Sequence, residues 1–197
     1  MLQAHEAVVR GSVFIAVFSL LAIAEQLSPR RRRVASQPLR WFSHAGLVLV
    51  NNLLVRVVMP VTALQAAEIA AERQWGLLHW FNGPEAVETV ATLIALDFAI
   101  WGQHVLFHKL PFAWRLHRVH HADLDLDVTS GVRFHTLEIL VSMAIKVVCV
   151  LLLGPTVLTV LIFELLLNAT SMFNHSNLRL PLMVDRWLRW MIVTPDM

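Results

Sequence analysis

Histidines are concentrated in one stretch of the chain, "WGQHVLFHKLPFAWRLHRVHH", residues 101–121. Histidine is unfavourable in hydrocarbon and requires polar partners, and a metal ion is the partner that several imidazoles most often share. Helical spacing of four places the first two rings on one face, and spacings of three and four place the other three together. They are His104, His108, His117, His120 and His121. The spacing therefore predicts a metal site.

Two later histidines are candidates for the same site: His135 in "GVRFHTLE" and His175 in "MFNHSNL". Each stands alone, so an isolated histidine without a metal role is the alternative for both. With them the candidates number seven, whereas one octahedral ion takes about six ligands and a catalytic ion keeps positions open. If most of the seven bind metal, two ions are required.

Two polar residues are expected to support the ligands. Asp97 lies seven residues, or two helical turns, before His104, and Asn174 directly precedes His175. A hydrogen bond from such a neighbour orients a ligating ring. The alternative for Asp97 is an ion pair with Arg56, since an unpaired charge within a membrane is unfavourable. No catalytic residue is predicted beyond the metal ligands.

Other metal chemistries fit this pattern poorly. No H-E-x-x-H zinc-protease motif is present, and clustered histidines do not suit a haem held between two helices. Cys149 is the only cysteine, so the chain can form neither an internal disulfide nor a cysteine-ligated iron–sulfur cluster.

Composition identifies the class of protein. Of 197 residues, 57% are hydrophobic and only 15% are charged, and the mean hydropathy is +0.62. Such a chain is too apolar for an ordinary soluble domain, so we predict a multi-span membrane protein. The net charge of +2 gives no reason to expect a nucleic-acid partner.

Apolar runs predict the spans of an all-α, polytopic membrane helical bundle. Three spans are expected within 11–24, 47–67 and 87–107, and a helical hairpin within 137–173, broken near Gly154–Pro155 into 137–153 and 156–173. Residues 1–197 are predicted to form one membrane domain. The aspartates of "DLDLD", residues 123–127, alternate with period two and are interpreted as a solvated loop.

Orientation follows from the basic residues. Arg30–Arg33 and Arg40 follow the first apolar run, and arginine is enriched on the cytoplasmic side of membranes. Counting spans from there brings all seven later histidines to the cytoplasmic face, provided that the hairpin breaks at Gly154–Pro155. The predicted fold is therefore a membrane bundle with a cytosolic-face histidine cluster.

The histidine motifs resemble those of the fatty acid hydroxylase / sterol desaturase superfamily. The resemblance extends from about Arg40 to Met197 and includes H-x3-H at 104–108, "HRVHH" at 117–121, "RFHTLE", "FNHSN" and "VTPDM". It implies a membrane-embedded, non-haem di-iron oxygenase with histidine ligands. On that pattern the expected iron ligands are His104, His108, His117, His120, His121 and His175.

The resemblance also implies a third histidine box, H-R-x-H-H, shortly after "TP". The sequence stops at Met197, where that box would begin. We therefore expect the C-terminal third-box region to be absent from this chain, and the chain alone to be inactive.

The expected activity is hydroxylation or desaturation of a lipid C–H bond, with two iron ions as cofactor and O2 as co-substrate. The chain shows no haem, flavin or iron–sulfur motif, so a separate electron-donor protein is expected. The expected location is a bacterial inner membrane. The alternative is a metal-binding or transport membrane protein without oxygenase activity.

Overall fold

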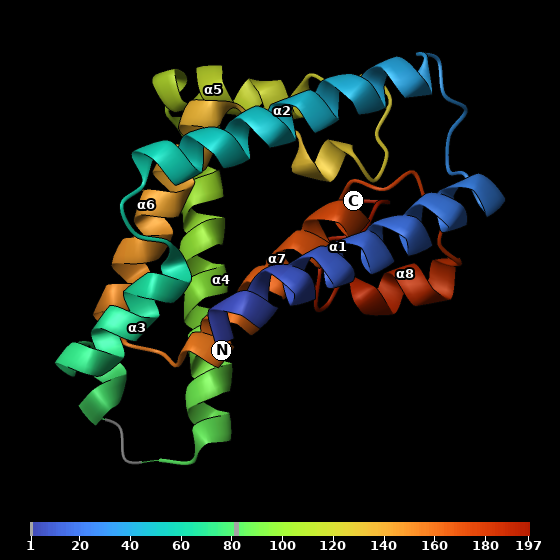
Figure 1. Cartoon of the computed structure of the whole chain (residues 1–197). Helices are drawn as coiled ribbons and strands as arrows, with labels where there is room; N and C mark the ends of the chain where they lie inside the picture. Colours follow the sequence, from blue (N-terminus) through green and yellow to red (C-terminus); the bar gives the residue numbers. More distant parts are fainter. Residues whose placement is uncertain (1, 81–82) are drawn as a thin grey trace. The chain divides into compact units, whose positions relative to one another are not determined.

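The computed structural model describes residues 2–80 and 83–197 (Figure 1). Within these ranges the regular structure is helical, apart from one isolated bridge between Pro29 and Leu178. The prediction of an all-α fold is confirmed. The elements are α1 Leu2–Leu27, α2 Gln37–Val58, α3 Ala63–Arg73, η1 Leu77–Trp80, α4 Glu85–Lys109, α5 Pro111–His121, η2 Ser130–Val132, α6 Thr136–Leu153, α7 Val157–Asn174 and α8 Leu182–Leu188.

Five helical segments of the described chain are long and apolar enough to cross a membrane, which confirms the prediction of a polytopic membrane protein. Large apolar side chains on them, such as Leu20, Ile94 and Phe98, are more than half exposed. Apolar surface of this kind is suited to lipid rather than water. The segments are His5–Leu27, Gln37–Trp80, Glu85–Lys109, Thr136–Leu153 and Val157–Asn174.

The predicted second span, 47–67, lies within the candidate span Gln37–Trp80 but is not a single helix. The chain breaks between Val58 and Ala63, because Pro60 has no N–H to continue the hydrogen-bond ladder. A capping box then starts α3: the Thr62 hydroxyl accepts the Gln65 backbone N–H, and the Gln65 side chain accepts the Thr62 N–H. The third span and both hairpin helices agree with the prediction to within two residues at each end.

The break between α6 and α7 falls at Gly154 and Pro155, as predicted. Gly154 ends α6 in the left-handed region, with φ at 69°, where glycine is favoured. A Cβ added to Gly154 would overlap the Trp75 carbonyl oxygen, and one added to Gly76 would overlap the backbone of Gly154. The end of α6 thus passes directly against the turn at Trp75 and Gly76.

The chain divides into two compact units. Three of their four boundaries fall inside α2, α5 and α7, and the fourth lies between η2 and α6. The prediction of one membrane domain stays a prediction. The first unit is Met1–Val48, His120–Arg133 and Leu165–Met197, and the second is Leu49–Val119 and Phe134–Glu164.

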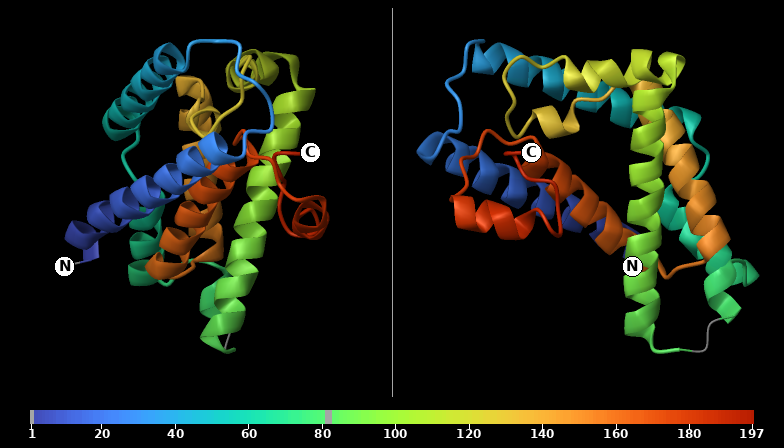
Figure 2. Two further views of the ribbon diagram at one scale, coloured as in Figure 1. Left: turned by 90° about the vertical axis from the view of Figure 1, so that its right-hand side faces the viewer. Right: turned by 180° about the vertical axis from the view of Figure 1, so that it is seen from behind.

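In the first unit, α1 runs alongside the end of α7 (Figures 1 and 2). The buried core of this unit consists of Leu21 of α1, Met172 of α7 and Val128, which lies between α5 and η2. Phe18 packs against it and meets the Trp41 ring edge-on, with ring centroids 5.3 Å apart. The first apolar helix is therefore packed against the residues that follow the histidine motif.

In the second unit, α6 packs against both α3 and α4 (Figures 1 and 2). The face that α3 buries consists largely of small residues, including Ala66, Ala67 and Ala70, which are fully buried. Small side chains let helix backbones approach closely, which is how membrane helices gain packing contacts. This packing fixes α4 and α6, the two helices that carry or contact the first histidines.

An ion pair lies within the apolar helices, but it does not join Arg56 to Asp97. Both of these residues are exposed, and no ion pair joins them in the described part of the chain, so the alternative of an Arg56–Asp97 pair is wrong. Instead, Lys146 of α6 lies 2.7 Å from Glu164 of α7, with side chains only 11% and 7% exposed. Two opposite charges thus neutralise each other between α6 and α7.

Candidate metal centre

The corner between α4 and α5 places the first histidines. α4 ends at Lys109, and Leu110 is extended, with φ −90° and ψ 120°, as expected of a residue before proline. Pro111 opens α5, where its fixed φ suits the first helical position. The His104 ring of α4 consequently lies against the His117 ring of α5, with centroids 4.6 Å apart.

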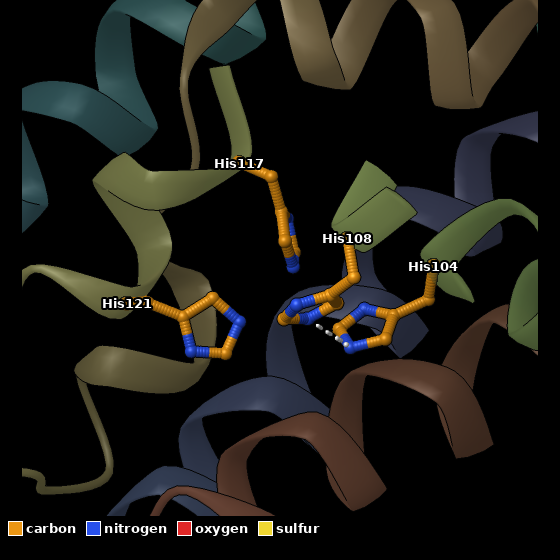
Figure 3. Close-up of side chains that lie close together, drawn as sticks. All are labelled: His104, His108, His117 and His121. Carbon is orange, nitrogen blue, oxygen red and sulfur yellow. Dashed lines mark hydrogen bonds between the residues drawn. The ribbon is translucent and has the colours of Figure 1, made fainter. Parts of the chain in front are cut away.

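Four histidines meet at this corner (Figure 3). His104 and His108 come from the last turns of α4, and His117 and His121 lie one turn apart on α5. Each offers one ring nitrogen, and these four atoms all lie within 4.8 Å of one another. The Nε2 atoms of His104 and His108 are 3.1 Å apart. The arrangement brings together four of the predicted ligands in a group with the dimensions of a metal site.

The ring of His117 is held by a carboxylate. His117 and Glu138 of α6 are both buried, and Nδ1 of the ring lies 2.6 Å from Oε1 of the carboxylate. An ionised carboxylate only accepts hydrogen bonds, so the ring donates its Nδ1–H and carries its lone pair on Nε2. In the described part of the chain, Oε2 of Glu138 has no hydrogen-bond partner.

A second pair of histidine rings lies in the first unit. His120 and His175 meet edge to face, with centroids 4.4 Å apart. Nδ1 of His120 lies 3.1 Å from the Arg133 carbonyl oxygen, and Nδ1 of His175 lies 2.8 Å from the Ser171 carbonyl oxygen. Because a carbonyl can only accept, each ring again donates through Nδ1 and carries its lone pair on Nε2.

The remaining predicted site residues have other contacts. His135 caps α6, and its Nδ1 accepts the Leu137 backbone N–H at 3.1 Å, which is the opposite polarity to the other rings. Asp97 is exposed on α4. The side-chain amide of Asn174 faces the carbonyl oxygens of Thr170 and Val193, at 2.8 and 2.6 Å. The carboxylate that contacts His117 is Glu138, which the sequence did not single out.

The "DLDLD" segment is not a solvated loop, and that interpretation is wrong. Arg40 donates to both oxygens of Asp123, at 2.9 and 2.7 Å, and to Asp127 at 2.8 Å. Trp41 also donates to Asp127. Asp125 accepts the backbone N–H groups of residues 34 and 35. The side chains of Asp123, Asp125 and Asp127 are all buried, so the alternation with period two places these aspartates on one buried polar face.

The pKa values of Asp123 and Asp125 agree with these hydrogen bonds. Burial alone would raise the pKa of Asp123, but hydrogen bonds from Arg40 and Ser130 outweigh burial and lower it. Hydrogen bonding to the Ala35 N–H likewise lowers the pKa of Asp125. Both carboxylates are thus held ionised, and they fix the segment that directly follows His121.

Comparison with known proteins identifies the family. The sequence profile of the fatty acid hydroxylase family matches residues 89–197, more than half of the chain. The chain is also similar to the ornithine lipid hydroxylase OlsE of Rhizobium tropici, with 24% identity over 147 residues, which are 72% of this chain and 44% of that protein. The chain thus spans less than half the length of that relative, and no solved structure matches it. All seven candidate histidines lie within the matched region, and the chain belongs to the fatty acid hydroxylase family.

Proposed function

We propose that the protein is a membrane-bound lipid hydroxylase in which histidines hold two iron ions. The observation that carries the proposal is the common hydrogen bonding of His117, His120 and His175, which all donate through Nδ1 to an oxygen. Metal-ligating histidines almost always donate their other N–H to a carboxylate or carbonyl, which fixes the tautomer and the ring orientation. The three rings share this polarity, as ligands of a metal would.

The donor set fits iron. Neutral imidazole suits iron as it also suits zinc, copper and nickel, and a ligand set without thiolate gives no preference for a cysteine-type zinc or iron–sulfur site. His104, His108, His117 and His121 would hold one ion, and His120 and His175 would contribute to the other. His135 is omitted from this set, because a neutral ring that accepts at Nδ1 has its proton on Nε2.

When bound, the iron pair would activate O2 toward an unreactive C–H bond. One oxygen atom would enter the product as a hydroxyl and the other would leave as water, with two electrons and two protons consumed. The chain's own task is to hold the rings: Glu138 would fix the His117 ring and stabilise the positive charge that a bound ion places on it. The electrons would come from a separate donor protein.

The surface near the histidines suits a lipid substrate. Trp101 and Leu106 on α4 and Phe112 on α5 are each more than half exposed, within a few residues of His104 and His108. An acyl chain can lie against such a surface without entering water. A membrane lipid is also the substrate class that the name of the Rhizobium tropici relative gives for that protein.

The proposed location is the inner membrane of a bacterium, with the histidines on the cytoplasmic face. The run Arg30–Arg33 begins three residues after α1 ends at Leu27. Arginines next to a span favour the cytoplasmic side. Cytoplasmic placement would give an electron donor direct access to the site.

Lipid profiling under 18O2 tests the activity. Lipids are extracted from the native host carrying the intact gene, from the same host carrying His117→Ala, and from one carrying His5→Ala as the matched control. We expect one 18O-labelled hydroxylated lipid that is lost with His117→Ala and retained with His5→Ala. Bound iron without any labelled product would instead favour a metal-binding or transport protein, and an unlabelled double bond would favour desaturation.

A further inference from the structure

Glu25 is a fully buried carboxylate in the last turn of α1, outside the region that matches the family profile. Its Oε1 accepts two backbone N–H groups at 2.7 Å, from Val128 and from Asn177. Its Oε2 accepts Nη2 of Arg33 at 3.1 Å. A single carboxylate oxygen therefore joins two chain segments that are far apart in sequence.

Both segments carry a histidine of the second pair. Asn177 is two residues beyond His175, and Val128 lies in the loop that follows His120. The rings of His120 and His175 are the ones in contact, with centroids 4.4 Å apart. All of these residues belong to the first unit.

Further contacts make the chain around Glu25 rigid. The Asn177 side chain accepts the Arg31 N–H and donates to the Arg31 carbonyl, both at 2.9 Å. Val128 is itself fully buried in the core between α1 and α7. Glu25 connects these two anchored segments directly, beside the hydrogen bond from the Ser171 hydroxyl to the Gly131 carbonyl, so its removal would loosen one segment relative to the other.

We propose that Glu25 is a positioning residue for His120 and His175. By holding the backbone after each histidine, it sets the separation of the two rings that would bind the same metal ion. The identity of that ion rests on the proposed function, whereas the positioning of the two rings does not. The consequence is that α1 contributes to the metal centre although it contains none of the ligands.

The first test measures binding of Fe2+ alone to the purified protein. We expect Glu25→Ala to weaken one Fe2+ site by about tenfold or more, the range typical when the hydrogen-bonded support of a ligand is lost. The site of His104, His108, His117 and His121 should keep its affinity. Glu25→Gln, which retains an oxygen acceptor, should restore part of the loss, and Glu6→Ala removes a carboxylate from the same helix as the matched control.

Unchanged affinity at both sites in Glu25→Ala would overturn the proposal. Equal loss at both sites would also overturn it, because that result indicates general destabilisation of the protein.

The second test needs no metal. His120→Cys and His175→Cys are combined with Cys149→Ser. The rate at which a short bifunctional thiol reagent cross-links positions 120 and 175 is then measured in the protein with Glu25 and in the protein with Glu25→Ala. We expect slower cross-linking without Glu25, together with faster hydrogen exchange at the Val128 and Asn177 amides. An unchanged cross-linking rate would overturn the proposal. If the wild-type protein binds no Fe2+, the proposed function fails while this test still decides the role of Glu25.

Discussion

Nδ1 of His117 lies 2.6 Å from Oε1 of Glu138, and both side chains are buried. Removing Glu138 would leave a buried N–H without its acceptor, a loss of about 1–3 kcal/mol, and would free the ring to rotate. We predict that Glu138→Ala lowers iron affinity about 10–100-fold, as measured by competition with a chelator.

Glu138→Gln should fall between the wild type and Glu138→Ala, because an amide oxygen still accepts the His117 N–H but carries no charge. The matched control is Glu85→Gln, which alters an exposed carboxylate at the start of α4. Wild-type iron affinity in Glu138→Ala would show that the carboxylate does not support a ligand.

The buried pair of Lys146 and Glu164 gives a prediction about stability. Replacing one partner leaves an uncompensated buried charge and destabilises by roughly 3–5 kcal/mol, whereas replacing both removes the charges together. We predict that Lys146→Met and Glu164→Leu each lower the thermal unfolding temperature in detergent, and that the double variant recovers much of the loss. Simply additive losses would contradict a direct interaction between the two charges.

The close approach at Gly76 predicts a backbone effect. Gly76 has φ at 109°, and a Cβ there would overlap the backbone of Gly154. We predict that Gly76→Ala destabilises the protein by about 1–3 kcal/mol or more. At Gly46, within α2, a Cβ meets nothing within 4 Å, so Gly46→Ala should stabilise by roughly 0.5–1 kcal/mol. Thermal unfolding of the two variants should therefore shift in opposite directions.

The pH dependence of stability should reflect Asp125. Its carboxylate accepts the N–H groups of Ala35 and Val34, with Arg40 and Asp123 as its charged neighbours, and these hydrogen bonds lower its pKa from the ordinary 3.8. A lowered folded-state pKa contributes stability above the unfolded-state value, and the contribution is lost as pH falls through the folded-state value.

We predict that stability falls below about pH 4 and that Asp125→Asn, which cannot ionise, shows a smaller fall. Thermal unfolding across that range measures both. An identical pH profile in the two proteins would show that Asp125 does not contribute.

Features determined by local chemistry could be predicted from the sequence. The break at Gly154–Pro155 follows from backbone chemistry at two residues, and the predicted ends of α6 and α7 were accurate for that reason. The face shared by His104 and His108 follows from helical spacing alone. Pro60 also interrupts an apolar region, and there the same chemistry separates α2 from α3 within the predicted second span.

Features determined by tertiary contacts could not be predicted in the same way. The alternating aspartates resemble a solvated strand or loop until Arg40, more than eighty residues away, is known to lie among them. Glu138 looks like an ordinary first-turn helix residue, since glutamate is favoured there by the helix dipole. The only feature of the sequence that could have identified Glu138 is its position three residues after His135 in "FHTLE". The ring that it contacts, His117, belongs to a different helix.

The metal content of the protein tests the central proposal most directly. The protein is purified in detergent from its native host, its metals are counted by elemental analysis, and the ligands are identified by X-ray absorption at the metal edge. The account predicts about two irons per chain, bound by imidazole nitrogen, with His117→Ala and His175→Ala each lowering the iron count. One tightly held zinc and no iron would contradict it.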